Sequence, residues 1–120
     1  MTMLFRHLAT GADGDTKIAG TGLRVYTVPG LYEIGQSVEY TADAYDVPIA
    51  AVFEALAYAY DHPDEMEAIR RVDEAAEEYS LGLLPEELRR YAKEMMRADE
   101  QEYQEAVRRA REERLGTLIP

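Results

Sequence analysis

Apolar residues recur at three- and four-residue spacing through a central segment of the chain, residues 37–60. Ser37 is a typical N-terminal cap for a first short helix, and the apolar period restarts after Pro48. Proline disfavours helical backbone at the preceding residue but fits the first turn of a new helix. The pattern predicts two helices that meet at a corner around Asp46, as in a helix-turn-helix motif. The second helix is expected to pack most of its surface through Ile49, Val52, Phe53, Leu56, Ala57 and Tyr60.

The segment before this motif predicts a small β element. Residues 3–8 are short and partly alternating, and a turn-forming cluster rich in glycine and aspartate follows at residues 11–15. A β-hairpin is predicted from residues 17–19 and 23–28, because the glycines of the intervening Gly-Thr-Gly supply the positive φ angles of a tight turn. A short helical link over residues 30–34 then leads to the serine cap.

Two longer helices are predicted after His62. Pro63 begins an acidic helix that ends near residues 80–84, and Pro85 begins a last helix that continues to about Leu115, roughly 45 Å long. The chain is therefore predicted to be mainly α, with an N-terminal β-hairpin, a helix-turn-helix core and long C-terminal helices. The predicted domains are residues 1–62, an acidic connecting helix at 63–84 and an amphipathic helix with a tail at 85–120.

Charge and composition narrow the class of protein. The chain has 24 acidic against 13 basic side chains, a formal net charge of −11 at pH 7, and only Lys17 and Lys93 as lysines. Such acid-rich, lysine-poor surfaces indicate a halophilic protein; the alternative is a merely acidic mesophilic protein. The sequence has neither an apolar run of about 18 residues nor a signal-peptide pattern, so we expect a cytoplasmic protein with no membrane contact.

The titratable residues predict neither catalysis nor metal binding. The chain has no cysteine, His7 and His62 lie far apart in sequence, and the carboxylates lack the spacing of a metal-binding loop. Asp61-His62 is better explained by capping or packing at a helix end than by a catalytic pair, since sequence neighbours point apart on a helix. We expect a protein that is not an enzyme and uses no cofactor.

Several motifs together resemble a known family. The run IAGTGLRV at residues 18–25, the short helix ending at Gly35 and the run FEALAYAYDHPDEM at residues 53–66 are similar to the antitoxin-like family catalogued as domain of unknown function 433. The resemblance covers roughly residues 18–69, and its most specific part is ALAY followed by DH at residues 55–62. It implies a helix-turn-helix domain, considered DNA-binding by fold analogy, in an antitoxin whose partner is a PIN-like ribonuclease.

The basic side chains of the N-terminal part are the predicted DNA contacts. The family pattern places an arginine after the hairpin threonine and a proline before the valine, where this chain has Gly22 and Arg24. The helix over residues 48–60 offers only Glu54 and tyrosine hydroxyls, so base reading by this helix is not expected. Contacts with the phosphates of operator DNA are therefore assigned to Arg6, His7, Lys17 and Arg24.

The last helix is the predicted toxin-binding segment. Its methionine- and tyrosine-rich face suits the groove of a partner, and its arginines suit the carboxylate cluster that holds magnesium in PIN-like nucleases. The alternative is a solvated helix that packs along its own domain or along a dimer mate. The predicted toxin-binding residues are Tyr91, Met95, Met96, Tyr103, Val107, Arg108, Arg109 and Arg111.

The expected function is that of an antitoxin in a type II toxin–antitoxin system, which binds and inhibits a PIN-like ribonuclease toxin and autoregulates its operon. The alternatives are a dimeric helix-turn-helix regulator without a toxin partner and a structural dimerisation module. A homodimer is expected, because unpaired strand edges and an almost uniformly apolar second helix need to be covered.

Overall fold

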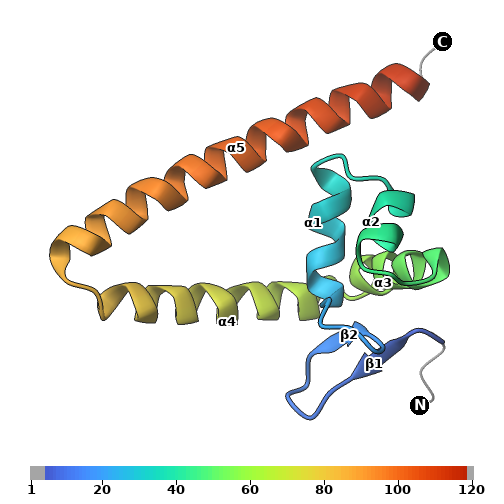
Figure 1. The fold of residues 1–120 in the computed structure, drawn as a ribbon, viewed down its shortest axis with the longest axis horizontal. Coiled ribbons are helices and arrows are strands. Elements are labelled where there is room, and N and C mark those ends of the chain that lie inside the picture. The colour runs from blue at the N-terminus through green and yellow to red at the C-terminus, as the bar shows by residue number, and fades with distance from the viewer. Residues whose placement is uncertain (1–4, 119–120) are drawn as a thin grey trace. The chain divides into compact units, whose positions relative to one another are not determined.

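The computed structural model describes residues 5–118 and is mainly helical (Figure 1). The contacts along the chain divide it into two units, Met1–Pro63 and Asp64–Pro120. Within the described residues, the first unit holds a two-stranded sheet and three α-helices, and the second holds two long α-helices. The predicted fold class is confirmed. None of the described helices combines the length and the apolar content that crossing a membrane requires.

The N-terminal sheet begins slightly later than predicted. Strand β1 (Leu8–Thr10) pairs antiparallel with β2 (Thr16–Ile18), and the cluster rich in glycine and aspartate forms the turn between them. Of the strand expected within residues 3–8, residues 3 and 4 lie outside the described residues, residues 5–7 are not in a strand, and Leu8 begins β1. The pairing places Leu8 opposite Ile18, and both side chains are buried, so this edge of the sheet contributes to the core.

The predicted hairpin strand over residues 23–28 is wrong, although the tight turn before it forms. The Thr21 hydroxyl donates to the Ile18 carbonyl at 2.8 Å and accepts from the Leu23 amide at 3.1 Å. After one bridging residue pair the chain enters a 3₁₀ turn, η1 (Val25–Thr27), instead of a second strand.

The spacing of buried valines explains why this segment coils. Val25 and Val28 are both fully buried, and residues three apart share one side of a helical turn but lie on opposite faces of a strand. Helix α1 (Val28–Glu33) follows at once, with Pro29 in its first turn where a missing amide hydrogen is tolerated. Gly35, with φ of 100°, lies just beyond the end of α1, so the predicted short helix is confirmed.

The two central helices form the predicted helix-turn-helix arrangement. Helices α2 (Val38–Ala44) and α3 (Ile49–Asp61) pack against each other across a short turn. The Ser37 hydroxyl accepts a hydrogen bond from the Tyr40 amide at 3.0 Å, as expected for an N-cap. Asp46 in the turn has a φ of 53°, a left-handed conformation that aspartate tolerates better than most residues.

The predicted buried face of α3 is largely wrong. This helix contacts α1, α2, η1 and both strands, so it is the centre of the first unit. Its small residues let it approach these elements closely, which leaves three of its large side chains, Ile49, Phe53 and Tyr60, exposed to solvent. The buried residues of α3 are Ala51, Val52, Ala55 and Ala59.

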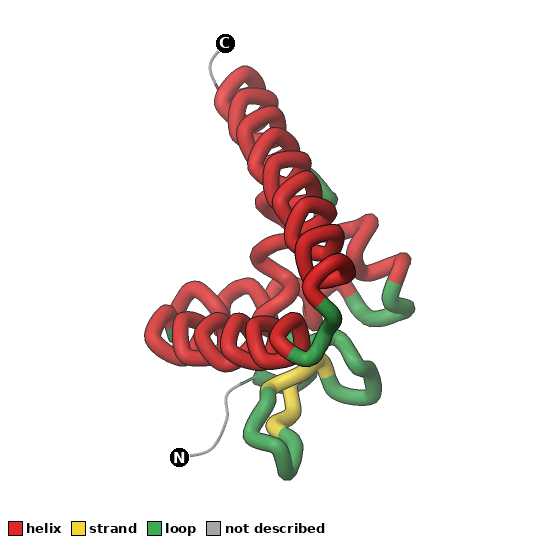
Figure 2. Tube along the Cα trace, turned by 90° about the vertical axis from the view of Figure 1, so that its left-hand side faces the viewer, coloured by secondary structure: helices red, strands yellow, loops and turns green. Residues whose placement is uncertain are grey.

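The second unit consists of helices α4 (Pro63–Gly82) and α5 (Glu86–Leu118). They are joined by a short loop, residues 83–85, which we call the elbow. Figure 2 shows this loop between two uninterrupted helices. Both predicted helices are confirmed, and α5 extends about three residues further than expected.

Candidate partner-binding surfaces

The basic side chains predicted to contact DNA are largely engaged by carboxylates within the first unit. The Nε of Arg24 donates to Oδ2 of Asp15 at 2.7 Å, and its guanidinium lies 5.3 Å from the ring centre of Tyr26. The Nζ of Lys17 lies 3.8 Å from a carboxylate oxygen of Asp13. These neighbouring negative charges reduce the positive potential that the two side chains present to a phosphate backbone.

His7 and Arg6 hold a carboxylate of α3. Glu54 accepts hydrogen bonds from the backbone amides of Arg6 at 2.6 Å and His7 at 3.0 Å, and its carboxylate also pairs with Nδ1 of the His7 ring. Partial burial opposes ionisation, but these hydrogen bonds lower the pKa of Glu54 below its usual value. The carboxylate of Glu54 is therefore not available to DNA. The side chain of Arg6, by contrast, is exposed.

Of the aspartate-histidine pair at the end of α3, His62 is a packing element, whereas Asp61 is exposed and its Oδ2 lies 3.8 Å from Nδ1 of His62. The ring of His62 stacks on Tyr58, with ring centres 4.0 Å apart, and its Nδ1 lies 2.8 Å from the Tyr58 carbonyl oxygen. The edge of Phe5 contacts the same tyrosine ring. Within residues 5–118, no group of three or more His, Asp or Glu side chains is placed to hold a metal ion.

Arg89 fixes the elbow of the second unit. Its guanidinium donates to the carbonyl oxygen of Leu81 at 3.3 Å and to that of Leu84 at 3.0 Å. The last carbonyl groups of a helix lack partners within the helix and carry partial negative charge, so a cation at this end is doubly favourable. A side chain from the first turn of α5 thereby completes the end of α4.

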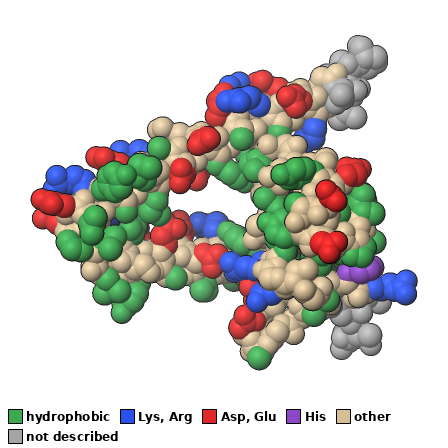
Figure 3. Space-filling view, viewed as in Figure 1, with side chains coloured by type: hydrophobic (Ala, Val, Ile, Leu, Met, Phe, Trp, Pro, Cys, Tyr) green, Lys and Arg blue, Asp and Glu red, His purple; other side chains and the backbone are tan. Residues whose placement is uncertain are grey.

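Large apolar side chains are exposed on both sides of the elbow, and we call this group the elbow patch. Figure 3 shows hydrophobic side chains gathered where α4 and α5 meet. Tyr91 and Met95 belong to the predicted toxin-binding residues, whereas Tyr79 and Leu83 were not among them. The sequence did contain a signal for them, because apolar residues recur at helical spacing on both sides of the helix break before Pro85. The elbow patch consists of Tyr79, Leu83, Leu88, Tyr91 and Met95, which are 72%, 70%, 54%, 61% and 49% exposed.

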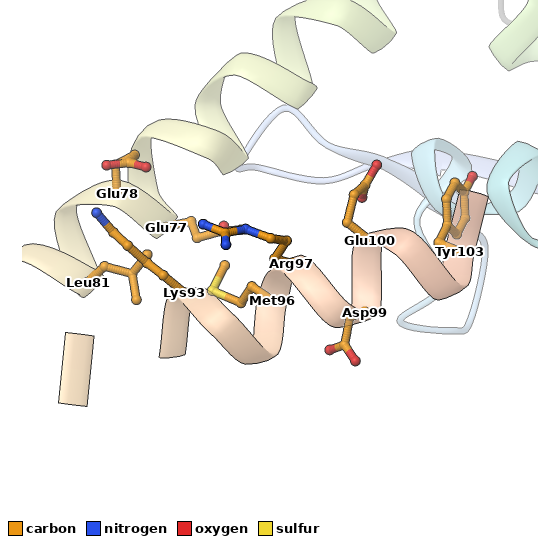
Figure 4. A pocket seen from close by; sticks show the side chains of 9 residues that line it. All are labelled: Glu77, Glu78, Leu81, Lys93, Met96, Arg97, Asp99, Glu100 and Tyr103. Atoms are coloured by element: carbon orange, nitrogen blue, oxygen red, sulfur yellow. The ribbon is translucent and has the colours of Figure 1, made fainter. Parts of the chain in front are cut away.

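An open cleft of about 840 Å³ lies beside the elbow, between α4 and α5 (Figure 4). Two further predicted toxin-binding residues, Met96 and Tyr103, line it from α5. Lys93 and Arg97 extend from α5 toward the acidic side of α4 (Figure 4). The other lining residues are Glu77, Glu78, Leu81, Asp99 and Glu100.

The predicted apolar anchors of α5 therefore occupy two edges of a broad face. At about 100° per residue, Met96 and Tyr103 lie roughly 100° around the helix from Tyr91 and Met95. Val107 follows Tyr103 by four residues on the same edge but is buried, with 6% of its surface exposed, so it is not available to a partner as predicted. A partner that covers the elbow patch contacts the first edge directly, whereas the second edge faces the cleft.

The three predicted arginines of α5 differ in their neighbours. Arg108 lies between Glu105 and Glu112, and these ion pairs raise the pKa of Arg108 and lower that of Glu105. The Nε of Arg109 is 3.4 Å from the same Glu105. Arg111 makes no ion pair with any residue in the part of the chain that the structure describes. Of these three arginines, Arg111 is therefore the one that breaks no ion pair when a partner binds.

Comparison with known proteins identifies part of the chain. Residues 11–59, from the turn after β1 to the last turn of α3, match the family described as "Protein of unknown function (DUF433)". This segment belongs to the DUF433 family. The resemblance drawn from the motifs is thus confirmed for the first unit, whereas the DUF433 match does not reach α4 or α5. The family description states no activity, so the antitoxin role stays a prediction. Searches of curated proteins and of solved structures gave no match.

Proposed function

We propose that the protein is an antitoxin that binds and inhibits a PIN-like ribonuclease through its second unit and represses its own operon. The observation that carries this proposal is the elbow patch, an exposed apolar surface on helices that are otherwise highly charged. Exposed apolar patches rimmed by polar residues mark sites of protein–protein interaction. The resemblance of the DUF433 segment to antitoxins supplies the class of partner.

Helix α5 has the dimensions to contact one small protein at two places. Leu88, Tyr91 and Met95 follow one another at three- and four-residue spacing and form a continuous ridge. Arg111 lies twenty residues after Tyr91, a distance of about 30 Å along the helix axis, which is the width of a small domain. At about 100° per residue, Arg111 lies roughly 140–200° around the helix from the ridge, so a nuclease that seats the ridge in a groove must also reach around α5 to contact Arg111.

Arg111 is the side chain that we assign to the acidic centre of the nuclease. A guanidinium forms two parallel hydrogen bonds with a carboxylate and thereby competes with a magnesium ion for it. Arg108 would first have to leave Glu105 and Glu112, whereas Arg111 has no such pair to break. The apolar ridge is expected to supply most of the affinity, and Arg111 most of the inhibition.

An RNA-cleavage assay with a PIN-like ribonuclease, from the same operon if the operon encodes one, tests the proposal. The double variant Tyr91→Ser/Met95→Ser should inhibit at least tenfold less well, because truncated anchors cost about 1–2 kcal/mol each. Val72→Ser is the matched control, since Val72 is 68% exposed on α4 but lies outside the elbow patch. Equal inhibition by all three proteins, or none by the unaltered chain, would contradict the proposal.

Two single variants separate binding from inhibition. Arg111→Ala should release nuclease activity while the complex still forms, whereas Arg108→Ala should leave inhibition nearly unchanged. Circular dichroism checks that α5 is retained in both variants. If Arg108→Ala alone restores cleavage, the assignment of the inhibitory arginine is wrong.

Operon repression is the second part of the proposal. Arg6, Lys17 and Arg24 are the side chains that we assign to phosphate contacts, and the carboxylates beside two of them predict weak, strongly salt-dependent binding. The triple alanine variant should lose an electrophoretic shift of operator DNA. An unaffected shift would move the contact to the arginines of α5. Operator binding by a chain that inhibits no nuclease would favour a helix-turn-helix regulator instead.

A further inference from the structure

A stripe of uncharged side chains runs along the exposed side of α3. Ile49, Phe53 and Tyr60 are 42%, 55% and 59% exposed, and Leu56 lies between them with partial exposure. At about 100° per residue these four side chains fall within roughly 60° of the helix circumference. We call them the α3 stripe; it lies on a different side of the helix from the buried alanines.

The chemistry of the α3 stripe excludes base reading. The second helix of a helix-turn-helix motif reads bases with arginine, lysine, asparagine or glutamine, and the stripe contains none of these. The two charged residues of α3, Glu54 and Asp61, lie about 100° or more around the helix from the centre of the stripe. Glu54 is moreover held by the amides of Arg6 and His7. The surface is suited to an apolar partner.

We propose that the α3 stripe pairs with the α3 stripe of a second copy of this chain. Each copy carries a net charge of −11, so two copies repel, and a surface without charged side chains is where they approach at least cost. An antiparallel two-fold arrangement places Ile49 of each copy opposite Tyr60 of the other, and Phe53 opposite Leu56. It also opposes the two helix dipoles. This pairing does not depend on a nuclease partner.

The size of the stripe sets the expected strength of the pairing. A buried aromatic side chain contributes 150–250 Å², so the roughly half-exposed phenylalanine and tyrosine offer about 100 Å² each. With their aliphatic neighbours, the stripes of two copies bury about 700 Å² in total, which is below the roughly 1,000 Å² of a stable specific interface and in the range of weak, transient ones. We therefore expect a reversible dimer with a dissociation constant in the micromolar range.

Sedimentation velocity of the full chain tests the pairing over roughly 1–300 µM, which brackets such a constant. The unaltered chain should change from the 13.6 kDa monomer to twice that mass. Phe53→Glu places a carboxylate in the centre of the stripe and should give a monomer throughout. The matched control is Leu88→Glu, because Leu88 is 54% exposed in the elbow patch, and it should dimerise like the unaltered chain. Circular dichroism confirms that both variants fold.

Loss of the dimer in Phe53→Glu alone supports the pairing. A chain that is monomeric throughout, a dimer that survives Phe53→Glu, or one that Leu88→Glu also abolishes overturns it. Leu88→Glu should in turn weaken nuclease binding while Phe53→Glu leaves it unchanged, so failure of this inference is distinguishable from failure of the antitoxin proposal.

Crosslinking tests the orientation. The chain has no cysteine, so Ile49→Cys and Tyr60→Cys each introduce a unique thiol. Neighbouring helix axes lie about 8–10 Å apart, so a bismaleimide of about 10 Å reach suits the pair. A mixture of the two variants should crosslink faster than either variant alone. Preferential crosslinking of Ile49→Cys with itself would overturn the antiparallel arrangement.

Discussion

Replacing Glu54 by glutamine should destabilise the first unit through the N-terminal segment. The side chain of Glu54 is 19% exposed and accepts hydrogen bonds from two backbone amides that are about 48 residues away in sequence. Glutamine keeps its size but presents one acceptor and one NH₂ group, so at least one of the two amides then faces another donor. A donor left without its charged acceptor costs about 1–3 kcal/mol.

A central value of about 2 kcal/mol corresponds to a fall in melting temperature of roughly 8–16 °C for a unit of this size. The direction of the pKa shift of Glu54 determines how the stability difference changes with pH. Because the folded-state pKa of Glu54 lies below its usual value of 4.5, the stabilisation is complete above that value and is lost as pH falls through the lower folded pKa. The difference between the unaltered chain and the variant should therefore be largest near neutral pH and shrink below about pH 4.5.

Urea unfolding followed by circular dichroism at pH 7 and at pH 3.5 measures both quantities. Asp43→Asn is the matched control, because Asp43 is an exposed carboxylate of α2, and it should change stability by less than about 0.5 kcal/mol. A Glu54→Gln variant as stable as the control at pH 7, or one whose loss of stability is the same at both pH values, would show that the ionised Glu54 carboxylate does not stabilise the N-terminal segment.

Three further variants probe the helix ends and surface pairs. Ser37→Ala removes the cap of α2 and should cost about 1 kcal/mol in urea unfolding. Arg89→Ala should accelerate amide exchange at the elbow, because the last carbonyl groups of α4 lose their donor, whereas Arg90→Ala should not. A hydrogen bond from Arg70 lowers the pKa of Glu67 to about 2, so Arg70→Ala should return the pKa that carbon-13 NMR measures toward 4.5.

Local sequence signals predicted the positions of the helices well. Serine and proline fix helix starts through the backbone of one or two residues, so Ser37, Pro63 and Pro85 each indicated a boundary without knowledge of tertiary contacts. Gly35 gave the end of α1 in the same way. The family motifs added the identity of the DUF433 segment, because they combine several short signals at fixed spacing.

The side of a helix that is buried depends on contacts that the sequence does not contain. The large apolar residues of α3 were expected to be buried, but its buried residues are three alanines and one valine, whose small size suits a helix surrounded by η1, α1, α2 and both strands. The expected strand over residues 23–28 failed for a related reason. A strand and a helical turn were both compatible with its valines, and burial of Val25 and Val28 on one side favoured the turn.

The candidate binding surfaces were predictable in part. The apolar residues and arginines of α5 were recognisable from helical spacing, but the pairing of Arg108 with two glutamates, and the absence of such a pair at Arg111, required side-chain positions. The contribution of Tyr79 and Leu83 required the elbow that Arg89 holds. That loop brings the exposed apolar residues of α4 and α5 to the same end of the second unit.

Hydrogen exchange of the full chain, alone and with the PIN-like ribonuclease used in the cleavage assay, tests the central claim most directly. We predict slower amide exchange in the complex over residues 79–95, around the elbow patch, and around Arg111, with the α3 stripe unaffected. Slower exchange confined to the first unit, or no change anywhere on addition of the nuclease, would contradict it.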